Sequence, residues 1–483
     1  MNKKRKFISI ILILNMTFLL VLAACKDNND ENPDNSTAND TNIIEMETQS
    51  YLETLPTDDF AGYNFKIIAQ HIWERPNFPA EEETGEPMND SLYRRNRQLE
   101  DRLNIKIENI AFADRGAVSQ NVNKSVKSDD LAYDMVITSM NDGINILAPG
   151  GSLYDLNSLN YMQLEKPWWS KSLYENMQVN GKIFYTTGSL SPCFYYAPVV
   201  CVYNKNKAAD LDMGDINRLV LDNKWTADKF AELIKDQNKD LDGDGAIRRN
   251  DFFGYIQDSC GILLFTGFGG KMTVKDDETI FRLNLEDEKV LTIINKCAQI
   301  LSDKTSVYKS DSGADGHVFV EGRALFSTVT IAWVVGYYRA MEDDYGVIPM
   351  PKLDSSQTEY ISYGNTWLPN GIAVPVYCDN PERTGLIMET MAALSYDMVR
   401  PAIYDNIIQQ KAARDEESQI MLDLIFSSVY FDLNVIHNFG GSYELVGNCS
   451  NGTKDDFVSG YAKIKDKAEA DLNKLIDSYL ESK

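Results

Sequence analysis

Histidine is scarce in this chain of 483 residues, which contains only His71, His317 and His437. Because the three stand apart in the sequence, each is expected to be a surface or packing residue rather than a catalyst. No G-x-S-x-G, P-loop, H-E-x-x-H or G-x-G-x-x-G pattern is present. These absences argue against the enzyme classes that carry those motifs. They leave a glycan hydrolase open, because that chemistry needs only two well-placed carboxylates.

Positive charge is also in short supply, with 47 Lys and Arg residues against 72 Asp and Glu residues and a formal net charge of −25. The first 24 residues hold four basic and no acidic side chains, so the rest of the chain has a formal charge of −29. Such a field repels nucleic acid and anionic lipid. It also disfavours a polyanionic ligand unless a local basic pocket overrides it, so a neutral ligand fits best. No organic cofactor is indicated.

The seven cysteines are widely scattered and form no C-x-x-C pair and no zinc-ligand spacing. A chain of this length does not need disulfide bonds to hold its core. Mostly buried free thiols are therefore favoured, with structural bridges as the alternative, for Cys193, Cys201, Cys260, Cys297, Cys378 and Cys449.

Long apolar runs are confined to the N-terminus, where a basic start is followed by an apolar stretch over residues 7–21. The stretch ends in Leu22-Ala23-Ala24-Cys25 and then turns polar. A charged start, an apolar middle and small residues at the exit are typical of a secretory signal. The ending resembles the lipobox of bacterial lipoproteins, which implies a signal peptide over residues 1–24 and a lipidated Cys25. An uncleaved membrane anchor is the alternative, and Asn15 and Thr17 weaken it.

Residues 25–59 carry the lipidated Cys and are rich in Asn, Asp, Glu and Thr without an apolar period, which predicts a disordered tether. The remaining chain is long enough for more than one core, and its composition is that of an ordinary globular protein. No second apolar run approaches membrane-spanning length. A water-soluble body tied to the membrane surface is therefore expected.

Strand and helix patterns alternate along this body, which predicts an α/β layer structure with parallel strand pairing. Short apolar runs predict strands over residues 65–69, 105–110, 134–137, 199–203, 324–326, 346–349 and 371–374. Helical spacing predicts helices over residues 91–103, 225–239, 383–394 and 461–480, the second of them capped by Thr226. The pair Trp168-Trp169 is interpreted as packing residues.

Several ordered stretches together resemble the extracellular solute-binding lipoproteins of bacterial ATP-binding-cassette importers, in the carbohydrate-binding group related to maltose-binding protein. They are Tyr133–Thr138 with Gly151–Leu156, Val202–Lys205 with Trp225–Asp228, and Phe319–Phe326 with Asp344–Lys352. The stretch Arg414–Ser418 resembles a longer-chain branch of that family. Each stretch alone is a weak signal, and their order and spacing carry the resemblance, which covers the chain from about Phe65 onward.

The resemblance implies an α/β, two-lobed periplasmic-binding-protein-like fold (type II) whose lobes are joined by a multi-segment hinge. The first lobe is expected to comprise residues 60–195 and 370–402, and the second residues 196–369 and 403–483. Crossings are expected near Pro192–Pro198, Trp367–Gly371 and Arg400–Tyr404. The implied function is capture of a carbohydrate, an oligosaccharide in particular, by a monomer on the extracellular face of the cell membrane. The implied partner is the membrane permease of the importer.

A sugar offers hydroxyl groups at its edge and apolar C–H faces, so its site needs aromatic platforms and side chains that both donate and accept hydrogen bonds. Aromatic and amide residues at predicted strand ends and at the crossings meet this description, with core packing as the alternative for each. The predicted ligand-binding residues are Trp73, Asn141, Asp142, Tyr195, Tyr196, Trp333, Asn365 and Trp367.

The segment Asp240–Asp251 matches the calcium loop of an EF-hand at its first, third and fifth positions and has a glycine at the sixth. It departs at the twelfth, where Asp251 replaces the usual Glu and its side chain is shorter. A structural Ca²⁺ is predicted, with an acidic Asp-Gly turn as the alternative. The expected ligands are Asp240, Asp242, Asp244, Ala246 and Asp251.

The leading hypothesis is therefore a binding protein without covalent chemistry. Capture of another solute such as a peptide, a surface glycan hydrolase and a sensor lipoprotein that signals to a membrane kinase are the alternatives.

Overall fold

A computed structural model describes residues 48–71, 80–258, 261–276, 280–310, 315–408, 416–453 and 456–482. The chain from Leu52 onward forms one compact unit. The predicted signal peptide and Cys25 lie outside the described residues. No helix of the described residues is long and apolar enough to cross a membrane.

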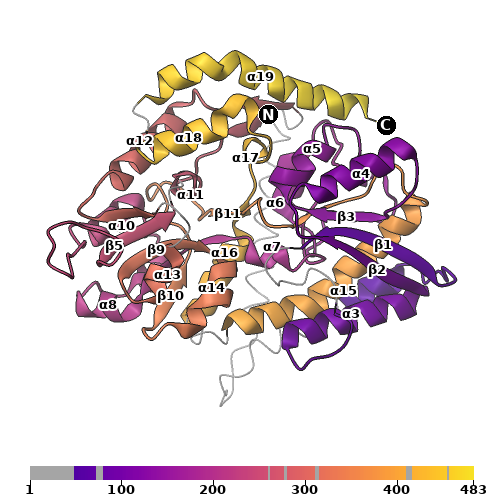
Figure 1. Cartoon of the computed structure of the whole chain (residues 1–483), viewed down its shortest axis with the longest axis horizontal. Helices are drawn as coiled ribbons and strands as arrows, with labels where there is room; N and C mark the ends of the chain where they lie inside the picture. Colours follow the sequence, from indigo (N-terminus) through magenta and orange to yellow (C-terminus); the bar gives the residue numbers. More distant parts are fainter. Residues whose placement is uncertain are drawn as a thin grey trace, which may run out of the picture. The chain divides into compact units, whose positions relative to one another are not determined.

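The first sheet has the strand order β12-β3-β1-β2 and is built mainly from parallel pairs. Its strands are β1 (Tyr63–Gln70), β2 (Ile105–Phe112), β3 (Met135–Thr138) and β12 (Gly371–Ala373). Ile68 lies opposite Ile110 on one side and Val136 on the other, and β12 runs antiparallel to β3. Helices α3 (Pro87–Leu103) and α15 (Pro381–Ile408) lie below this sheet in Figure 1, and α4 (Ala117–Ser128) lies above it. The predicted strands and the α/β layering are confirmed.

The second sheet has the order β10-β4-β9-β5-β8 and mixes parallel with antiparallel pairs. Its strands are β4 (Val199–Asn204), β5 (Phe253–Asp258), β8 (Val307–Ser310), β9 (Ala324–Thr330) and β10 (Tyr345–Ile348). Trp225 stacks on Phe326 of β9 with ring centroids 5.8 Å apart. Phe230 meets both rings edge-on. This buried aromatic cluster holds the helix after Trp225 against the sheet.

That helix, α10 (Ala227–Ile234), begins as predicted, because the Thr226 hydroxyl accepts a hydrogen bond from the Lys229 backbone N–H at 3.4 Å. It ends five residues earlier than the predicted Lys239. Asp236 adopts a left-handed conformation (φ 56°), and Lys239 already pairs with Phe252. A turn that depends on one backbone angle leaves little trace in the hydrophobic pattern.

The other described elements connect and cover the two sheets. The remaining helices are η1 (Met140–Ile144), α5 (Asn145–Leu147), η2 (Leu156–Ser158), α6 (Lys171–Met177), α7 (Cys193–Tyr196), α8 (Lys205–Asp210), α9 (Ile216–Leu221), α11 (Ile262–Gly267), α12 (Glu288–Leu301), α13 (Asp315–Val320), α14 (Ile331–Tyr337), η3 (Tyr338–Ala340), α16 (Glu416–Ser427), α17 (Leu433–His437), η4 (Phe439–Gly441), α18 (Ser442–Ser450) and α19 (Phe457–Glu481). The remaining strands are β6 (Thr273–Asp276), β7 (Ile280–Leu283), β11 (Ser362–Tyr363) and β13 (Val429–Tyr430).

Each sheet with its helices forms one lobe, and the chain passes between the lobes at three places. It passes first through α7 into β4, then from β11 to β12, and finally along α15. Val399 and Ile403 of α15 are buried in one cluster with Val200 of the second sheet and Leu92 of α3. The lobes therefore share a continuous apolar core around these crossings.

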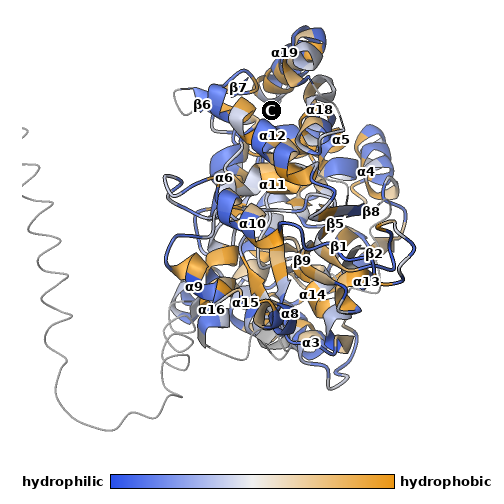
Figure 2. Ribbon diagram, turned by 90° about the vertical axis from the view of Figure 1, so that its left-hand side faces the viewer, coloured by the Kyte–Doolittle hydropathy of each residue, from blue (hydrophilic) through white to orange (hydrophobic). Residues whose placement is uncertain are grey.

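Helix α19 contacts both lobes. Its beginning is buried in the second-lobe core through Phe457 and Tyr461. Its end lies on the first lobe, where the rings of Tyr479 and Phe184 meet edge-on at 4.6 Å. The segment with Phe184 belongs to the first lobe, because Thr186 pairs with Ile372 of β12. The end of α19, which falls in the predicted second-lobe range 403–483, thus contacts the first lobe. The helix carries hydrophobic and hydrophilic residues along its length, as Figure 2 shows.

The predicted tether is too long at its C-terminal end. Residues 48–54 are helical, and Leu52 and Leu55 are 3% and 7% exposed. The guanidinium of Arg102 donates to the backbone oxygens of Leu52 (2.5 Å) and Leu55 (3.1 Å). Two leucines spaced at one helical turn therefore fix this segment, although its average composition is polar.

Two packing predictions are confirmed. Trp168 and Trp169 are buried, and their indole N–H groups donate to the Glu389 carboxylate at 2.9 and 2.8 Å. The described cysteines are buried free thiols, and burial raises the pKa of Cys378 to about 11. They are Cys193, Cys201, Cys297, Cys378 and Cys449.

Candidate functional site

Backbone hydrogen bonds bring four chain segments together at the junction of the lobes. The N–H of Ile331, at the start of α14, donates to Pro198 O at 3.0 Å, and the N–H of Asn365 donates to Ala197 O at 3.0 Å. The N–H of Met140, at the start of η1, donates to Thr366 O at 2.9 Å. Five predicted binding residues lie on these linked segments, namely Asn141, Asp142, Trp333, Asn365 and Trp367.

Trp367 presents a partly exposed ring beside a charged pair. The residue is 37% exposed, and the Arg115 guanidinium lies 5.7 Å from the ring centre. Arg115 Nη1 is also 3.6 Å from the Asp142 carboxylate. Asn365 Oδ1 accepts the Trp367 backbone N–H at 2.9 Å, which fixes the turn that carries the ring. The cluster combines an aromatic surface with a cation and an acceptor, a combination suited to a polar ligand with an apolar face.

Trp333 belongs to an aromatic cluster in the second lobe. Its ring lies 4.5 Å from that of Tyr337, one turn later on α14, and His317 contacts both rings edge-on at 5.3 and 5.4 Å. Trp333 is half-buried, whereas Tyr337 is 46% exposed. One side of the predicted Trp333 platform is therefore packed against protein. Tyr337 is the more exposed aromatic side chain of the cluster.

Asn141 makes a hydrogen bond that crosses between the lobes. Its Nδ2 donates to the backbone oxygen of Val435 at 2.7 Å. Val435 lies in the short helix α17, whose start is fixed by the buried Asp432 carboxylate. That carboxylate accepts the N–H groups of Asn434 (2.9 Å) and Met272 (2.8 Å). Burial raises the pKa of Asp432, and these donors oppose the rise. Asn141 thus caps the last turn of a helix from the opposite lobe.

The two predicted tyrosines at the first crossing are core residues. Tyr195 and Tyr196 are each 4% exposed. The Tyr195 hydroxyl bonds the Ser189 hydroxyl at 2.6 Å, and burial raises the pKa of Tyr195. The Tyr196 hydroxyl donates to the Met88 sulfur at 2.8 Å. Both residues lie in α7, and their packing leaves no open ring surface, so we exclude them from the candidate site.

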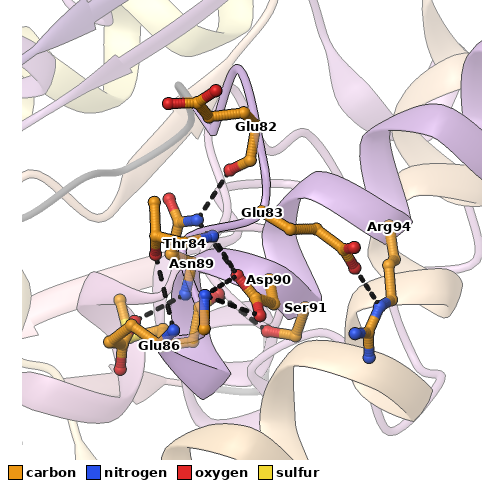
Figure 3. A network of polar contacts seen from close by, with 10 residues as sticks. Glu82, Glu83, Thr84, Glu86, Asn89, Asp90, Ser91 and Arg94 are labelled. Carbon is orange, nitrogen blue, oxygen red and sulfur yellow. Dashed lines mark hydrogen bonds and ion pairs between the residues drawn. The ribbon is translucent and has the colours of Figure 1, made fainter.

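Trp73 lies outside the described residues, in the segment 72–79. The chain that follows this segment is held at the start of α3 by the polar network in Figure 3. The Asp90 carboxylate accepts the N–H groups of Thr84 (2.8 Å) and Gly85 (3.2 Å), and these bonds lower the pKa of Asp90. Glu86 caps α3 by accepting the Asn89 N–H at 2.7 Å. The network fixes the described residues that lead into α3.

The predicted calcium loop places three of its expected ligands together. One carboxylate oxygen each from Asp240, Asp242 and Asp244 lies within 4.8 Å of the others, and all three residues are exposed. Asp240 accepts the N–H groups of Gly243 (2.6 Å) and Gly245 (2.7 Å), and chiefly the latter bond lowers its pKa. Both glycines have positive φ angles, of 77° and 79°, as the tight turn requires. These three carboxylates fit a hard divalent cation.

The C-terminal part of the loop fits a calcium site less well. Asp251 is 1% exposed, and its two carboxylate oxygens accept the N–H groups of Leu241 (2.9 Å) and Arg248 (2.6 Å). The Arg248 guanidinium forms an ion pair with Asp244. Asp251 therefore braces the loop, and the ion pair would have to open before Asp244 could bind an ion. Ala246 is held through its N–H, which donates to Asp244 at 2.9 Å.

Sequence reasoning overlooked several residues of the candidate site. Arg115 follows β2 in a stretch without periodicity, and Tyr337 is one of 25 tyrosines. His437 was expected to be a surface or packing residue, and it packs on Phe439 at the end of the helix that Asn141 contacts. The contact between Asn141 and Val435 spans 294 residues of sequence, so no local signal could have revealed it.

Two α/β lobes joined by several crossings, with polar and aromatic residues at their junction, define a class of solute-binding proteins that hold a ligand between their lobes. The family model "Bacterial extracellular solute-binding protein" matches residues 98–392. The chain therefore belongs to that family, and the predicted two-lobed type II fold is confirmed.

Solved structures share this fold at low sequence identity. A cyclo/maltodextrin-binding protein complexed with maltotetraose is 15% identical, with 86% of this chain and 96% of that chain covered and a TM-score of 0.55. UspC from M. tuberculosis is 13% identical (84% and 100% covered, TM-score 0.55). UgpB from Mycobacterium tuberculosis, in complex with glycerophosphocholine, is 13% identical (86% and 99% covered, TM-score 0.52). No curated protein sequence matches the chain significantly.

Proposed function

We propose that this protein captures a neutral carbohydrate, an oligosaccharide in particular, and delivers it to the permease of an ATP-binding-cassette importer. The observation that carries the proposal is the junction cluster, where the exposed ring of Trp367 lies beside Arg115 and Asp142. An aromatic face suits the C–H surface of a sugar, and the charged pair suits its hydroxyl groups.

Charge favours a neutral ligand over an anionic one. The chain carries a formal charge of −25, and the cation at the site, Arg115, is already paired with Asp142. A related fold binds maltotetraose, and another binds glycerophosphocholine, so the fold alone does not select between them. The charge of this chain disfavours an anionic ligand and is compatible with a neutral sugar.

Binding would work by closure of the lobes. Trp367 lies on a crossing segment, Asn141 belongs to the first lobe and α17 belongs to the second. A ligand that contacts both sides favours the closed arrangement over the open one by its difference in affinity for the two. Only binding and closure are required for this function, without covalent chemistry.

The protein would act as a monomer on the extracellular face of the cell membrane, held by a lipid on Cys25. The support is the apolar stretch and its Leu-Ala-Ala-Cys ending. Two or more acyl chains give a stable anchor, whereas one is marginal. Fatty acid labelling that persists in Cys25→Ser would contradict the anchor.

The loop Asp240–Asp251 would hold a structural Ca²⁺ outside the cell. Three gathered carboxylates support this, although the Arg248–Asp244 ion pair must open first. A weak site, with a Kd on the order of 0.1 to 1 mM, suffices for an extracellular module.

A thermal-shift screen tests the main proposal. The mature chain is melted with neutral mono- and oligosaccharides including maltotetraose, with glycerophosphocholine, and with short peptides. We expect one or more oligosaccharides to raise the melting temperature in proportion to the logarithm of concentration. Stabilisation by peptides or glycerophosphocholine alone would refute sugar capture. Release of shorter glycans during incubation would indicate a hydrolase instead.

A further inference from the structure

Hydrogen bonds join the lobes directly at β6 and at α17, away from the chain crossings. The Lys275 ammonium on β6 donates to the backbone oxygen of Glu175 in the last turn of α6. The Asn141 amide donates to the backbone oxygen of Val435 in α17 at 2.7 Å. In each case a side chain of one lobe binds the end of a short helix of the other lobe, where carbonyl oxygens lack partners within the helix.

The contact at β6 crosses from the second lobe to the first. Met272, directly before β6, is buried in the second-lobe core. Ser170, which caps α6, donates its backbone N–H to Thr187 O at 2.8 Å, next to the residue that pairs with β12 of the first sheet. The Lys275 ammonium lies 5.2 Å from the ring centre of Phe281, its partner on β7, which favours its position. Strand β13 contacts α6 as well, so the ammonium is part of a wider interface.

One buried carboxylate fixes the second-lobe side of both contacts. Asp432 is 5% exposed, and it accepts the Met272 N–H at 2.8 Å and the Thr273 hydroxyl at 2.9 Å from the hairpin of β6 and β7. It also accepts the Asn434 N–H at 2.9 Å, at the start of α17. The hairpin and α17 lie 160 positions apart in sequence at this bond. If one moved without the other, polar groups would be left buried without partners, which is unfavourable.

We propose that Asp432 makes the β6–β7 hairpin and α17 one interlobe strap, which holds the lobes together and releases both of its contacts in one step. The strap comprises residues 272–276, 280–283 and 429–437. This inference concerns the equilibrium between open and closed lobes, and it does not depend on which solute the protein binds. Because open lobes lack both contacts, the strap raises the share of closed molecules, and a ligand that needs closed lobes then binds more tightly.

Double electron–electron resonance measures the distance between the lobes in the ligand-free mature chain. Spin labels are attached at Lys127→Cys on α4 of the first lobe and at Asp210→Cys on α8 of the second lobe, which are exposed positions outside the strap. The background carries Cys25→Ser and Cys260→Ser, and the other native cysteines are buried, so the labels react at the introduced thiols. We expect one dominant distance, that of the closed lobes.

Lys275→Met tests the hairpin contact, because it removes the ammonium and keeps an unbranched side chain. Arg282→Met is the matched control. Arg282 lies on β7, and its guanidinium pairs with Asp276 of the same hairpin at 2.7 Å, within the second lobe. We expect Lys275→Met to raise the ratio of open to closed molecules about threefold, as for a solvent-exposed charged contact, and Arg282→Met to leave it unchanged.

Asp432→Asn tests the coupling. The amide keeps the size of the side chain but has one acceptor oxygen, and its own N–H groups face the donors of the hairpin and of α17. We expect the ratio of open to closed molecules to rise at least about tenfold, because both contacts loosen together. In the Asp432→Asn background, Lys275→Met should then add less than about 1.5-fold. Melting curves verify folding, and Thr273→Val, which removes only the hydroxyl donor, replaces Asp432→Asn if that variant does not fold.

The outcomes separate the strap from its alternatives. If Lys275→Met or the variant at the carboxylate keeps the wild-type distances, the strap is refuted. If the two effects multiply in the double variant, the contacts act independently and the coupling through Asp432 is refuted. A wild-type chain that is mostly open would also overturn the proposal, because the strap would not hold the lobes.

Discussion

Lowering the pH is a direct perturbation of His437, because the structure requires its ring to stay neutral. Burial lowers the pKa of His437 from 6.5 to about 3, so the folded chain binds this proton less readily than the unfolded chain. The stability from this group is fully present above pH 6.5 and is lost as the pH falls toward 3. Proton linkage with these two pKa values lowers the free energy of unfolding at pH 5 by about 2 kcal/mol relative to neutral pH. Because the ring is half-buried, this figure is an upper value.

Proton NMR tests this directly, since the chain has only three histidines. The signal that disappears in His437→Gln belongs to His437, and it should show no titration between pH 8 and pH 4.5. Urea unfolding at pH 7.5 and pH 5 should then show a smaller loss of stability in His437→Gln than in wild type. Because the His437 ring stays neutral at both pH 7.5 and pH 5, it should cause no difference in oligosaccharide affinity between these two pH values. Titration of the His437 signal near pH 6.5 would refute the burial argument.

The other predictions concern the junction, the loop and the first-lobe core. Trp367→Ala should weaken oligosaccharide binding about tenfold in calorimetry, with the similarly exposed Tyr377→Ala as control; equal affinities would remove Trp367 from the site. Millimolar Ca²⁺ should raise the melting temperature of wild type and leave that of Asp242→Ala unchanged. If Ca²⁺ does not raise the melting temperature of wild type, the loop is an acidic Asp-Gly turn without a bound ion. Glu389→Gln should lower the free energy of unfolding by about 1–3 kcal/mol, because one of two buried indole N–H groups loses its acceptor. Unchanged sugar affinity is expected for Glu389→Gln, and a loss would indicate that Glu389 also shapes the site.

The fold was largely accessible from sequence because its signals are local. The apolar run over residues 65–69 lies in β1, and Thr226 caps α10 as its residue type predicts. The two-lobed arrangement followed from the order of several weak stretches. The end of α10 was missed, because the left-handed turn at Asp236 has no hydrophobic signature.

The site was only partly accessible, because its contacts join distant segments. Asp142 could be named from its place after a strand and Trp367 from its place just before a crossing, but Arg115 between them could not. Tyr195 satisfied the same rule and proved to be a core residue, since residue type does not tell an open aromatic ring from a packed one. The contact between α17 and η1 could be found only from the fold, because these elements lie far apart in the sequence.

The contacts of the final helix depend on the distance between the two lobes. With 25 residues, α19 is about 37 Å long, and it is seated on the second lobe by Phe457 and on the first by Tyr479. A straight helix that contacts both lobes cannot keep both contacts when the lobes move apart. Opening of the lobes must therefore release one end of α19. The last turns are held by the fully buried Tyr479 and by hydrogen bonds from Lys182 to the backbone oxygens of Leu480 and Ser482. Carboxypeptidase digestion of these turns would therefore report how often the lobes separate, and ligand should slow it.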